Sequence, residues 1–186
     1  MLRRMRSSCG VTVIELLVGL GIIALLTALT LQNLPMWISS TQLSKDRNSF
    51  AALIYTARAA AINLNHQVIL CPGTTSRGCA KRDTWQQGAI AFADSNRNRQ
   101  YDQDDPFVAG FGSIDSQIEW RSFRNRSYLK FLPSGRTDWQ NGHFKFCGNS
   151  EKGLQLVLNR AGRLYFSHDE DGDGWHEDVR GRDLIC

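Results

Sequence analysis

The chain has 186 residues, of which 42% are hydrophobic and 22% are charged. Its 22 basic and 18 acidic residues give a formal charge of +4, and removing the three arginines that precede Gly10 leaves 19 against 18. This near-neutral balance excludes a strongly basic nucleic-acid-binding domain, so a nucleic-acid site would have to be a local patch. The length accommodates one soluble domain of ordinary size and one apolar segment.

The N-terminal segment is the most apolar part of the chain. Leu16–Leu31 is a run of sixteen residues without a charge, bounded by Glu15 and Gln32. A helix needs about 20 residues to cross a bilayer, and adding residues 11–14 restores that length but includes Glu15. The basic residues before the run predict a cytoplasmic N-terminus. No small-residue cleavage site follows the run, which disfavours an ordinary secretory signal peptide.

A second helical pattern follows Pro35. Apolar residues recur at spacings of three, four and seven, at Leu43, Phe50, Leu53, Ile54, Ala57, Ala61 and Leu64. The polar face is expected to carry Gln42, Lys45, Asp46, Arg58 and Asn63. The pattern is that of an amphipathic helix. We therefore expect one helix from about Val11 to Leu64, kinked at Pro35.

Short apolar runs separated by turn-forming residues predict strands in the rest of the chain. The expected strands are Gln67–Cys71, Ala89–Ala93, Gln117–Arg121, Tyr128–Leu132, His143–Cys147, Leu154–Leu158 and Arg163–Ser167. Seven strands and one long helix predict an α+β fold, with an antiparallel sheet packed on the amphipathic helix.

Four cysteines lie beyond the N-terminal segment, at Cys71, Cys79, Cys147 and Cys186. Their spacing is too wide for a zinc site of the C-x2-C kind. An even number of cysteines fits two disulfides formed in an oxidising compartment. Four cysteines allow three pairings, of which we favour Cys71–Cys79 with Cys147–Cys186; buried free thiols are the alternative.

The N-terminal motif has a short basic leader, then Gly10, then VTVIELLVGL with Glu15 five residues after the glycine. It resembles the type III signal of type IV pilins and type II secretion pseudopilins. The resemblance implies that a prepilin peptidase cleaves between Gly10 and Val11 and methylates the new N-terminus at Val11. Glu15 is then the fifth residue of the mature chain.

A carboxylate at Glu15 is consistent with that resemblance. An isolated acid in a hydrocarbon layer costs about 2.5–3.5 kcal/mol on insertion scales, so it is normally paired or functional. The α-amine created at Val11 is a positive partner, and in a filament Glu15 of one subunit would meet the amine of its neighbour. The alternative is an acid at a helix end that reaches the lipid headgroups.

The remainder resembles the GspH/FimT branch of minor pilins and pseudopilins, in TARAAAINLNHQVILCP, in YLKFLPSGR with GHFKFC, and in LQLVLNRAGRLYFSHDEDGDG. The resemblance implies a minor subunit that helps initiate or prime assembly of a type IV pilus or a type II secretion pseudopilus. Its implied partners are other major and minor pilins or pseudopilins, the prepilin peptidase and the inner membrane.

The resemblance also implies four segments. Residues 1–10 are a cleaved leader, 11–34 a transmembrane and assembly helix, 35–66 the amphipathic half of that helix, and 67–186 a periplasmic β-rich domain. The N-terminus is expected in the cytoplasm.

A membrane-tethered DNA receptor is the first alternative function. Some members of this branch bind DNA through a G-R-x-R motif, but here Gly162, Arg163 and Leu164 precede Tyr165. The candidate DNA-binding residues are Arg160, Arg163, Arg180 and Arg182. Several clustered cations are needed to hold phosphates, and the acids from Asp169 onward would repel them.

A calcium-stabilised periplasmic module is the second alternative, because two segments resemble calcium loops. The first offers Asp94, Asn96, Asn98, Asp102 and Asp105, with Arg99 where the turn favours glycine. The second offers Asp169, Asp171, Asp173 and Glu177, with Arg180 in place of the closing carboxylate. The competing interpretation is a polar loop whose side chains cap its own turns.

Catalytic motifs are missing from the sequence. There is no G-x-S-x-G, no H-E-x-x-H and no glycine-rich phosphate loop. We therefore expect no enzyme activity, no catalytic residue, and no cofactor apart from the calcium considered above.

Overall fold

The computed structural model describes residues 12–31, 34–80 and 82–186. The expected leader and the cleavage site at Gly10 and Val11 lie outside these ranges. The chain divides into two units, one ending at Ile38 and the other running from Ser39 to Cys186.

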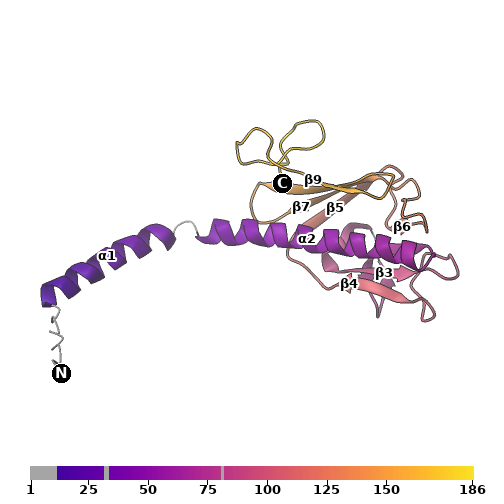
Figure 1. Ribbon diagram of the computed structural model, residues 1–186, viewed down its shortest axis with the longest axis horizontal. Coiled ribbons are helices and arrows are strands. Elements are labelled where there is room, and N and C mark those ends of the chain that lie inside the picture. The colour runs from indigo at the N-terminus through magenta and orange to yellow at the C-terminus, as the bar shows by residue number, and fades with distance from the viewer. Residues whose placement is uncertain (1–11, 32–33, 81) are drawn as a thin grey trace, which may run out of the picture. The chain divides into compact units, whose positions relative to one another are not determined.

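Two helices form the N-terminal part of the chain, α1 at Val13–Leu31 and α2 at Leu34–Asn63 (Figure 1). One continuous helix with a kink was expected. Instead, Pro35 lies in the first turn of α2, where its missing N–H leaves no helical hydrogen bond unmade. At its other end α2 closes with Asn65 in a left-handed conformation (φ 50°), and the N–H of His66 donates to Ala61 O.

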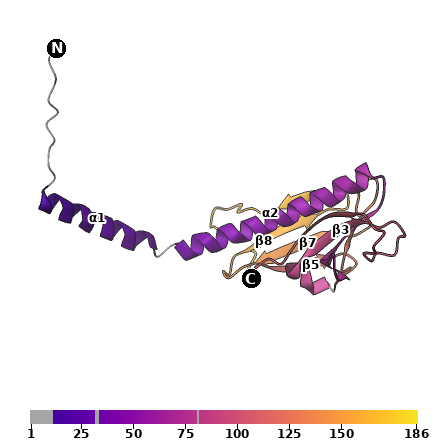
Figure 2. The same ribbon diagram turned by 90° about the horizontal axis from the view of Figure 1, so that it is seen from below.

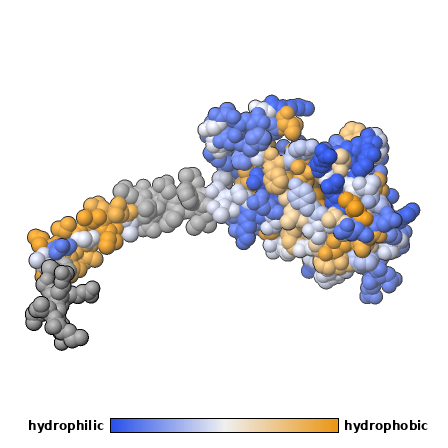
Figure 3. Space-filling model, viewed as in Figure 1, coloured by the Kyte–Doolittle hydropathy of each residue, from blue (hydrophilic) through white to orange (hydrophobic). Residues whose placement is uncertain are grey.

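Hydrophobic side chains gather along α1 (Figure 3). Ten apolar residues of α1 are between 54% and 77% exposed. They are Val13, Ile14, Leu16, Leu17, Val18, Leu20, Ile22, Ile23, Leu25 and Leu26. Within residues 12–31, 34–80 and 82–186, no helix combines the length and the apolar character needed to cross a membrane.

The second unit contains two antiparallel sheets (Figures 1 and 2). The first has the order β2-β1-β3-β4, and β6 pairs with β1. Its strands are β1 (Val68–Thr74), β2 (Gly78–Cys79), β3 (Ala89–Ala93), β4 (Phe107–Phe111) and β6 (Leu129–Phe131). The second has the order β5-β7-β8-β9. Its strands are β5 (Gln117–Ser122), β7 (Gly142–Cys147), β8 (Gly153–Leu158) and β9 (Leu164–Phe166). A short 3-10 helix, η1 (Arg82–Gln87), precedes β3.

The α+β fold is confirmed, and each of the seven expected strands overlaps a strand of the structure. The expectation of a single sheet was wrong, and β2 and β4 were not anticipated. Alternation along a strand identifies which side chains face a core, but it does not say which strands pair. β4 is short and contains Gly110, so its apolar run is weak as a strand signal.

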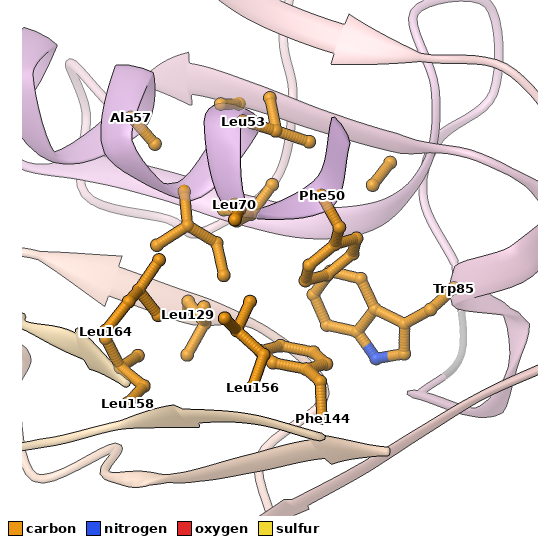
Figure 4. Close-up of a cluster of buried hydrophobic side chains, with 14 of the residues drawn as sticks. Phe50, Leu53, Ala57, Leu70, Trp85, Leu129, Phe144, Leu156, Leu158 and Leu164 are labelled. Carbon is orange, nitrogen blue, oxygen red and sulfur yellow. The ribbon is translucent and has the colours of Figure 1, made fainter. Parts of the chain in front are cut away.

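The buried face of α2 meets both sheets in one core (Figure 4). Phe50 of α2 is fully buried, with ring centroids 4.5 Å from Phe144 and 5.6 Å from Trp85. Trp120 of β5 stacks on Phe144 of β7 at 4.1 Å. Tilted and edge-on aromatic pairs add to the gain from burying their area. This aromatic centre therefore fixes α2 against the strands.

A smaller cluster covers the other face of the first sheet. It contains Ile69, Cys71, Ile90 and Phe92, with Tyr101 packed against it. β1 and β3 are consequently buried on both faces, which explains their continuous apolar sequences.

Candidate functional site

Glu15 lies in the first turn of α1 and is exposed. Its N–H donates to the Thr12 hydroxyl at 3.3 Å, as at the start of many helices. The hydroxyl of Thr27 donates back to the Ile23 carbonyl at 2.9 Å. Glu15 is the sole charged residue of α1, and its position on an otherwise apolar helix makes it the candidate assembly residue.

Three of the four candidate DNA-binding arginines line one shallow groove of about 700 Å³ on the second sheet. Arg160, Arg180 and Arg182 lie in its wall, and Arg163 does not. The Arg160 guanidinium carbon lies 3.1 Å from the ring centroid of Trp139, a close cation–π contact. The structure thus gathers part of the predicted set beside an aromatic surface.

The positive charge of this groove is partly neutralised. Arg182 donates to the Asp178 carboxylate through Nη2 at 2.6 Å and through Nε at 3.0 Å. This hydrogen bonding from Arg182 lowers the pKa of Asp178 to about 2. One of the three arginines therefore already has an anionic partner within the chain.

Gly162, in the stretch that resembles the DNA-binding motif, has a packing role. Its φ is +77°, and a Cβ placed on it would lie 2.2 Å from the main-chain oxygen of Gly135. The same oxygen accepts a hydrogen bond from Arg58 Nε of α2 at 2.9 Å. The glycine lets two turns and the end of α2 meet closely.

The carboxylates of the first acidic loop accept hydrogen bonds from other residues of the same loop. Asp94 is fully buried and accepts from the N–H groups of Asn98 at 3.0 Å and Arg99 at 3.1 Å. Asp105 accepts from the N–H of Ser95 at 2.9 Å. Asp102 accepts from the side-chain amides of the two asparagines of the predicted set, Asn96 and Asn98. Arg99 makes the sharp turn with a φ of 66°, without glycine.

The second acidic loop brings its four predicted residues together. One oxygen atom from each of Asp169, Asp171, Asp173 and Glu177 lies within 4.8 Å of the others. Among the described residues this is the one group of acids, cysteines or histidines arranged closely enough for a metal ion.

Two disulfides are present, Cys71–Cys79 and Cys147–Cys186. These are the pairs favoured from the sequence. The first joins β1 to β2, and the second joins the end of β7 to the C-terminal residue.

Comparison with known proteins identifies the family. The family model described as type II transport protein GspH matches residues 46–162, well over half of the chain. The chain belongs to the GspH family. No curated protein matches this GspH-family chain by sequence.

One solved structure agrees with this assignment at the level of the fold. The type IV minor pilin FimU of Pseudomonas aeruginosa is similar over 69% of this chain and 90% of its own, with a TM-score of 0.51 and 13% identity. A second crystal form of FimU gives a TM-score of 0.47, also at 13% identity, and covers 65% of this chain and 89% of its own. The first of these two similarities shows a pilin-like α+β fold for the GspH-family chain, and its family consists of structural pilin and pseudopilin subunits.

Some residues of the GspH-family domain escaped prediction from the sequence. Phe123 and Trp139 line the arginine groove, and Phe123 is 70% exposed. Each is an isolated aromatic beside turn residues, so no spacing signal marks it. Arg47 of α2 lies over the Phe166 ring at 5.0 Å, and burial lowers its pKa.

Proposed function

We propose that this GspH-family protein is a minor subunit that helps initiate or prime a type IV pilus or a type II secretion pseudopilus, with α1 as its assembly element. Family membership supports the class of subunit. The observation that carries the assembly role is Glu15, the sole charge on a helix whose apolar side chains are exposed.

The exposed side chains of α1 require a partner surface. Contiguous apolar patches of this kind mark interaction sites. We propose that α1 packs among the corresponding helices of neighbouring subunits in the filament, and that lipid of the inner membrane covers it before assembly. The polar hydroxyl of Thr27 is bonded within the helix, which is compatible with either apolar environment.

Removal of the leader peptide supplies the positive charge that Glu15 pairs with in the assembled filament. The proposed cleavage by the prepilin peptidase between Gly10 and Val11 creates an α-amine four residues before Glu15, and the same enzyme methylates it. The Glu15 carboxylate of one subunit then pairs with the Val11 amine of the next. Two charges that are each costly in an apolar bundle become acceptable as a pair, and the pairing sets the axial register of neighbouring helices.

The two disulfides support a periplasmic location for the globular domain, because disulfides persist in oxidising compartments. With the basic leader in the cytoplasm, we propose that residues 11–34, a range longer than the described helix α1, span the inner membrane and that the domain begun by residues 35–66 lies outside.

Intact mass and N-terminal sequencing of the protein purified from cells with the peptidase test the processing step. The expected product begins with a methylated Val11. A Gly10→Val variant, which lacks the residue before the cleaved bond, should keep its leader. An unprocessed Met1 in the native protein would contradict the proposal.

The pairing role of Glu15 is tested by comparing Glu15→Gln with Glu15→Asp. The glutamine keeps the size of the side chain but loses its charge, so the variant should accumulate in the membrane and be lost from sheared filaments. The aspartate keeps the charge and should be incorporated at least in part. Normal incorporation of Glu15→Gln would show that the carboxylate does not pair with a neighbour.

The priming role predicts an effect on filament number. Deleting the subunit should reduce the number of filaments per cell in electron micrographs and leave the length of the remaining filaments unchanged. Shorter filaments in unchanged number would instead indicate a subunit distributed along the shaft.

A further inference from the structure

The second acidic loop follows β9 and occupies residues 169–177. One oxygen from each of Asp169, Asp171, Asp173 and Glu177 lies within 4.8 Å of the other three. Calcium binds oxygen at 2.3–2.6 Å, so two ligands on opposite sides of one ion are about 4.8 Å apart. The spacing of these oxygens therefore fits a single calcium ion between them.

Glu177 supplies an independent indication of a ligand. Its residue is only 8% exposed, and its Oε2 accepts from the N–H of Glu170 at 2.8 Å. Its Oε1 is buried and has no hydrogen-bond partner among the described residues. A buried carboxylate oxygen without a partner is costly, and a bound cation removes that cost.

The loop backbone already holds the aspartates in place. Asp169 accepts from the N–H groups of Gly172 at 2.7 Å and Gly174 at 2.8 Å. Asp171 accepts from the N–H of Asp173 at 3.1 Å. These hydrogen bonds fix the positions of the two carboxylates before any ion arrives.

The cluster has no ion-pair partner among the described side chains. No ion pair in the described part of the chain involves any of its four carboxylates. Lys152 lies against this loop, and its Nζ donates to the Gly174 main-chain oxygen at 2.6 Å and lies 5.1 Å from the Trp175 ring centroid. Its contacts are with the backbone and an aromatic ring, and the carboxylates are left for another cation.

We propose that Asp169, Asp171, Asp173 and Glu177 form a calcium site. All four ligands are carboxylate oxygens, which suit a hard cation, and calcium takes six to eight oxygens in flexible geometry, so main-chain carbonyls and water complete the shell. Magnesium demands near-ideal octahedral geometry and fits an irregular loop less well. Glu177, at the ninth position of the loop, supplies the carboxylate that Arg180 does not supply at the twelfth.

Binding at this loop would fasten the C-terminal segment of the domain. The N–H of Leu184 donates to His176 O at 2.8 Å, and the N–H of Gly153 in β8 donates to Leu184 O at 2.7 Å. Calcium would hold the residues on which these bonds depend. This inference is independent of the assembly role proposed for α1.

Thermal unfolding of the full-length chain in a mild detergent, with both disulfides formed, tests the site. Millimolar calcium should raise the unfolding temperature relative to a chelator, because a ligand that binds only the folded state stabilises it. Magnesium at the same concentration should give a smaller rise. No shift with calcium would overturn the proposal, and an equal shift with magnesium would overturn the assignment to calcium.

Substitutions in the loop test whether calcium binds at these four carboxylates. Glu177→Gln should weaken calcium binding by at least about tenfold, because affinity follows the number of charged ligands. Asp173→Asn changes an exposed ligand, and it provides the same test if Glu177→Gln fails to fold. The matched control is Glu170→Gln, which removes a charge from the same loop outside the cluster and should keep the calcium shift. If Glu170→Gln and Glu177→Gln lowered the calcium-dependent rise in unfolding temperature equally, the rise would reflect only general attraction of calcium to a negatively charged loop. That result would overturn the site.

Terbium offers a direct readout, because Trp175 lies within the loop and can sensitise its luminescence. Tryptophan excitation should give terbium emission that calcium displaces, that Trp175→Phe abolishes, and that in Glu177→Gln requires at least about tenfold more terbium. Emission with the same terbium dependence in Glu177→Gln as in the native chain, or emission that calcium does not displace, would contradict the site.

Discussion

The carboxylate of Asp46 on α2 receives two hydrogen bonds from Ser116, the residue before β5. Asp46 Oδ2 accepts from the serine hydroxyl at 2.5 Å and from its N–H at 3.3 Å. Both residues are buried, at 3% and 2% exposed. Gln42 donates to the other carboxylate oxygen at 2.9 Å. A single buried acid thereby ties the helix to the start of the second sheet.

Asp46→Ala should lower the free energy of unfolding by about 2–4 kcal/mol, because hydrogen bonds to a charged acceptor are lost and buried donors of Ser116 are left unpaired. Urea unfolding measures the change. The neighbouring Lys45→Ala, at an exposed position, should change it by no more than about 0.5 kcal/mol. Equal effects of the two substitutions would show that the Asp46 bonds contribute nothing.

The expected place of Asp46 on the solvent face of α2 was wrong, for an instructive reason. It stands three residues after Leu43 and four before Phe50, a position on the buried face. The spacing of apolar residues along the helix predicts that Asp46 is buried, but the charge of its side chain suggested that it is exposed. A partner such as Ser116, 70 residues away, cannot be read from local spacing.

The strands show what local pattern does predict. Runs such as those of β1 and β3 are apolar without interruption because both of their faces are buried, and such runs are readily recognised. The division into two sheets depends on which strands pair across long separations, so the pattern could not reveal it.

The two acidic loops have similar spacing and different arrangements. In the first, Asp94 is fully buried and its oxygens accept from loop N–H groups and from Gln67 Nε2 at 2.7 Å. In the second, Glu177 keeps an oxygen without a partner among the described residues. The sequence thus identifies both candidate loops. It does not reveal which carboxylate oxygens already accept hydrogen bonds within the folded protein, and this is the property in which the two loops differ.

Gly162→Ala should destabilise the domain strongly. An alanine there must adopt a left-handed φ of +77°, and its Cβ would meet the backbone oxygen of Gly135 at 2.2 Å. Gly181→Ala is the matched control, because its φ is +70° and nothing lies within 4 Å of the added Cβ. The control should lose about 1–2 kcal/mol from backbone strain alone, and Gly162→Ala should lose at least about 2 kcal/mol more from the clash, as measured by urea unfolding. Similar losses would show that the turn at Gly135 moves aside freely.

Replacing Cys147 and Cys186 together with serine should lower the free energy of unfolding by about 4 kcal/mol, because that disulfide closes a long loop in the unfolded chain. Its cysteines are 39 residues apart, against 8 for Cys71–Cys79. Hydrogen exchange should also accelerate at Gly153, whose N–H donates to Leu184 O in the tethered segment. Unchanged stability and unchanged exchange would show that the C-terminal residues are held without the disulfide.

Asp178 should make the stability depend on pH in acid. Hydrogen bonds from the Arg182 side chain lower its pKa from 3.8 to about 2, and the N–H groups of Arg180 and Arg182 contribute. Because the folded-state pKa is depressed, the stabilisation is fully present above the ordinary pKa and is lost as the pH falls through the folded value. The stability difference between the native chain and Asp178→Asn should therefore be constant near neutral pH and shrink between pH 3.8 and about 2.

Carboxyl NMR titration of Asp178 measures its pKa directly. Arg182→Gln keeps a hydrogen-bonding side chain but removes the charge, so it should move the Asp178 pKa upward toward 3.8. The same variant should narrow the pH interval over which Asp178→Asn and its parent differ in stability, since the two properties arise from one interaction. An Asp178 pKa that stays low in Arg182→Gln would assign the shift to the backbone N–H groups of this turn and not to the guanidinium.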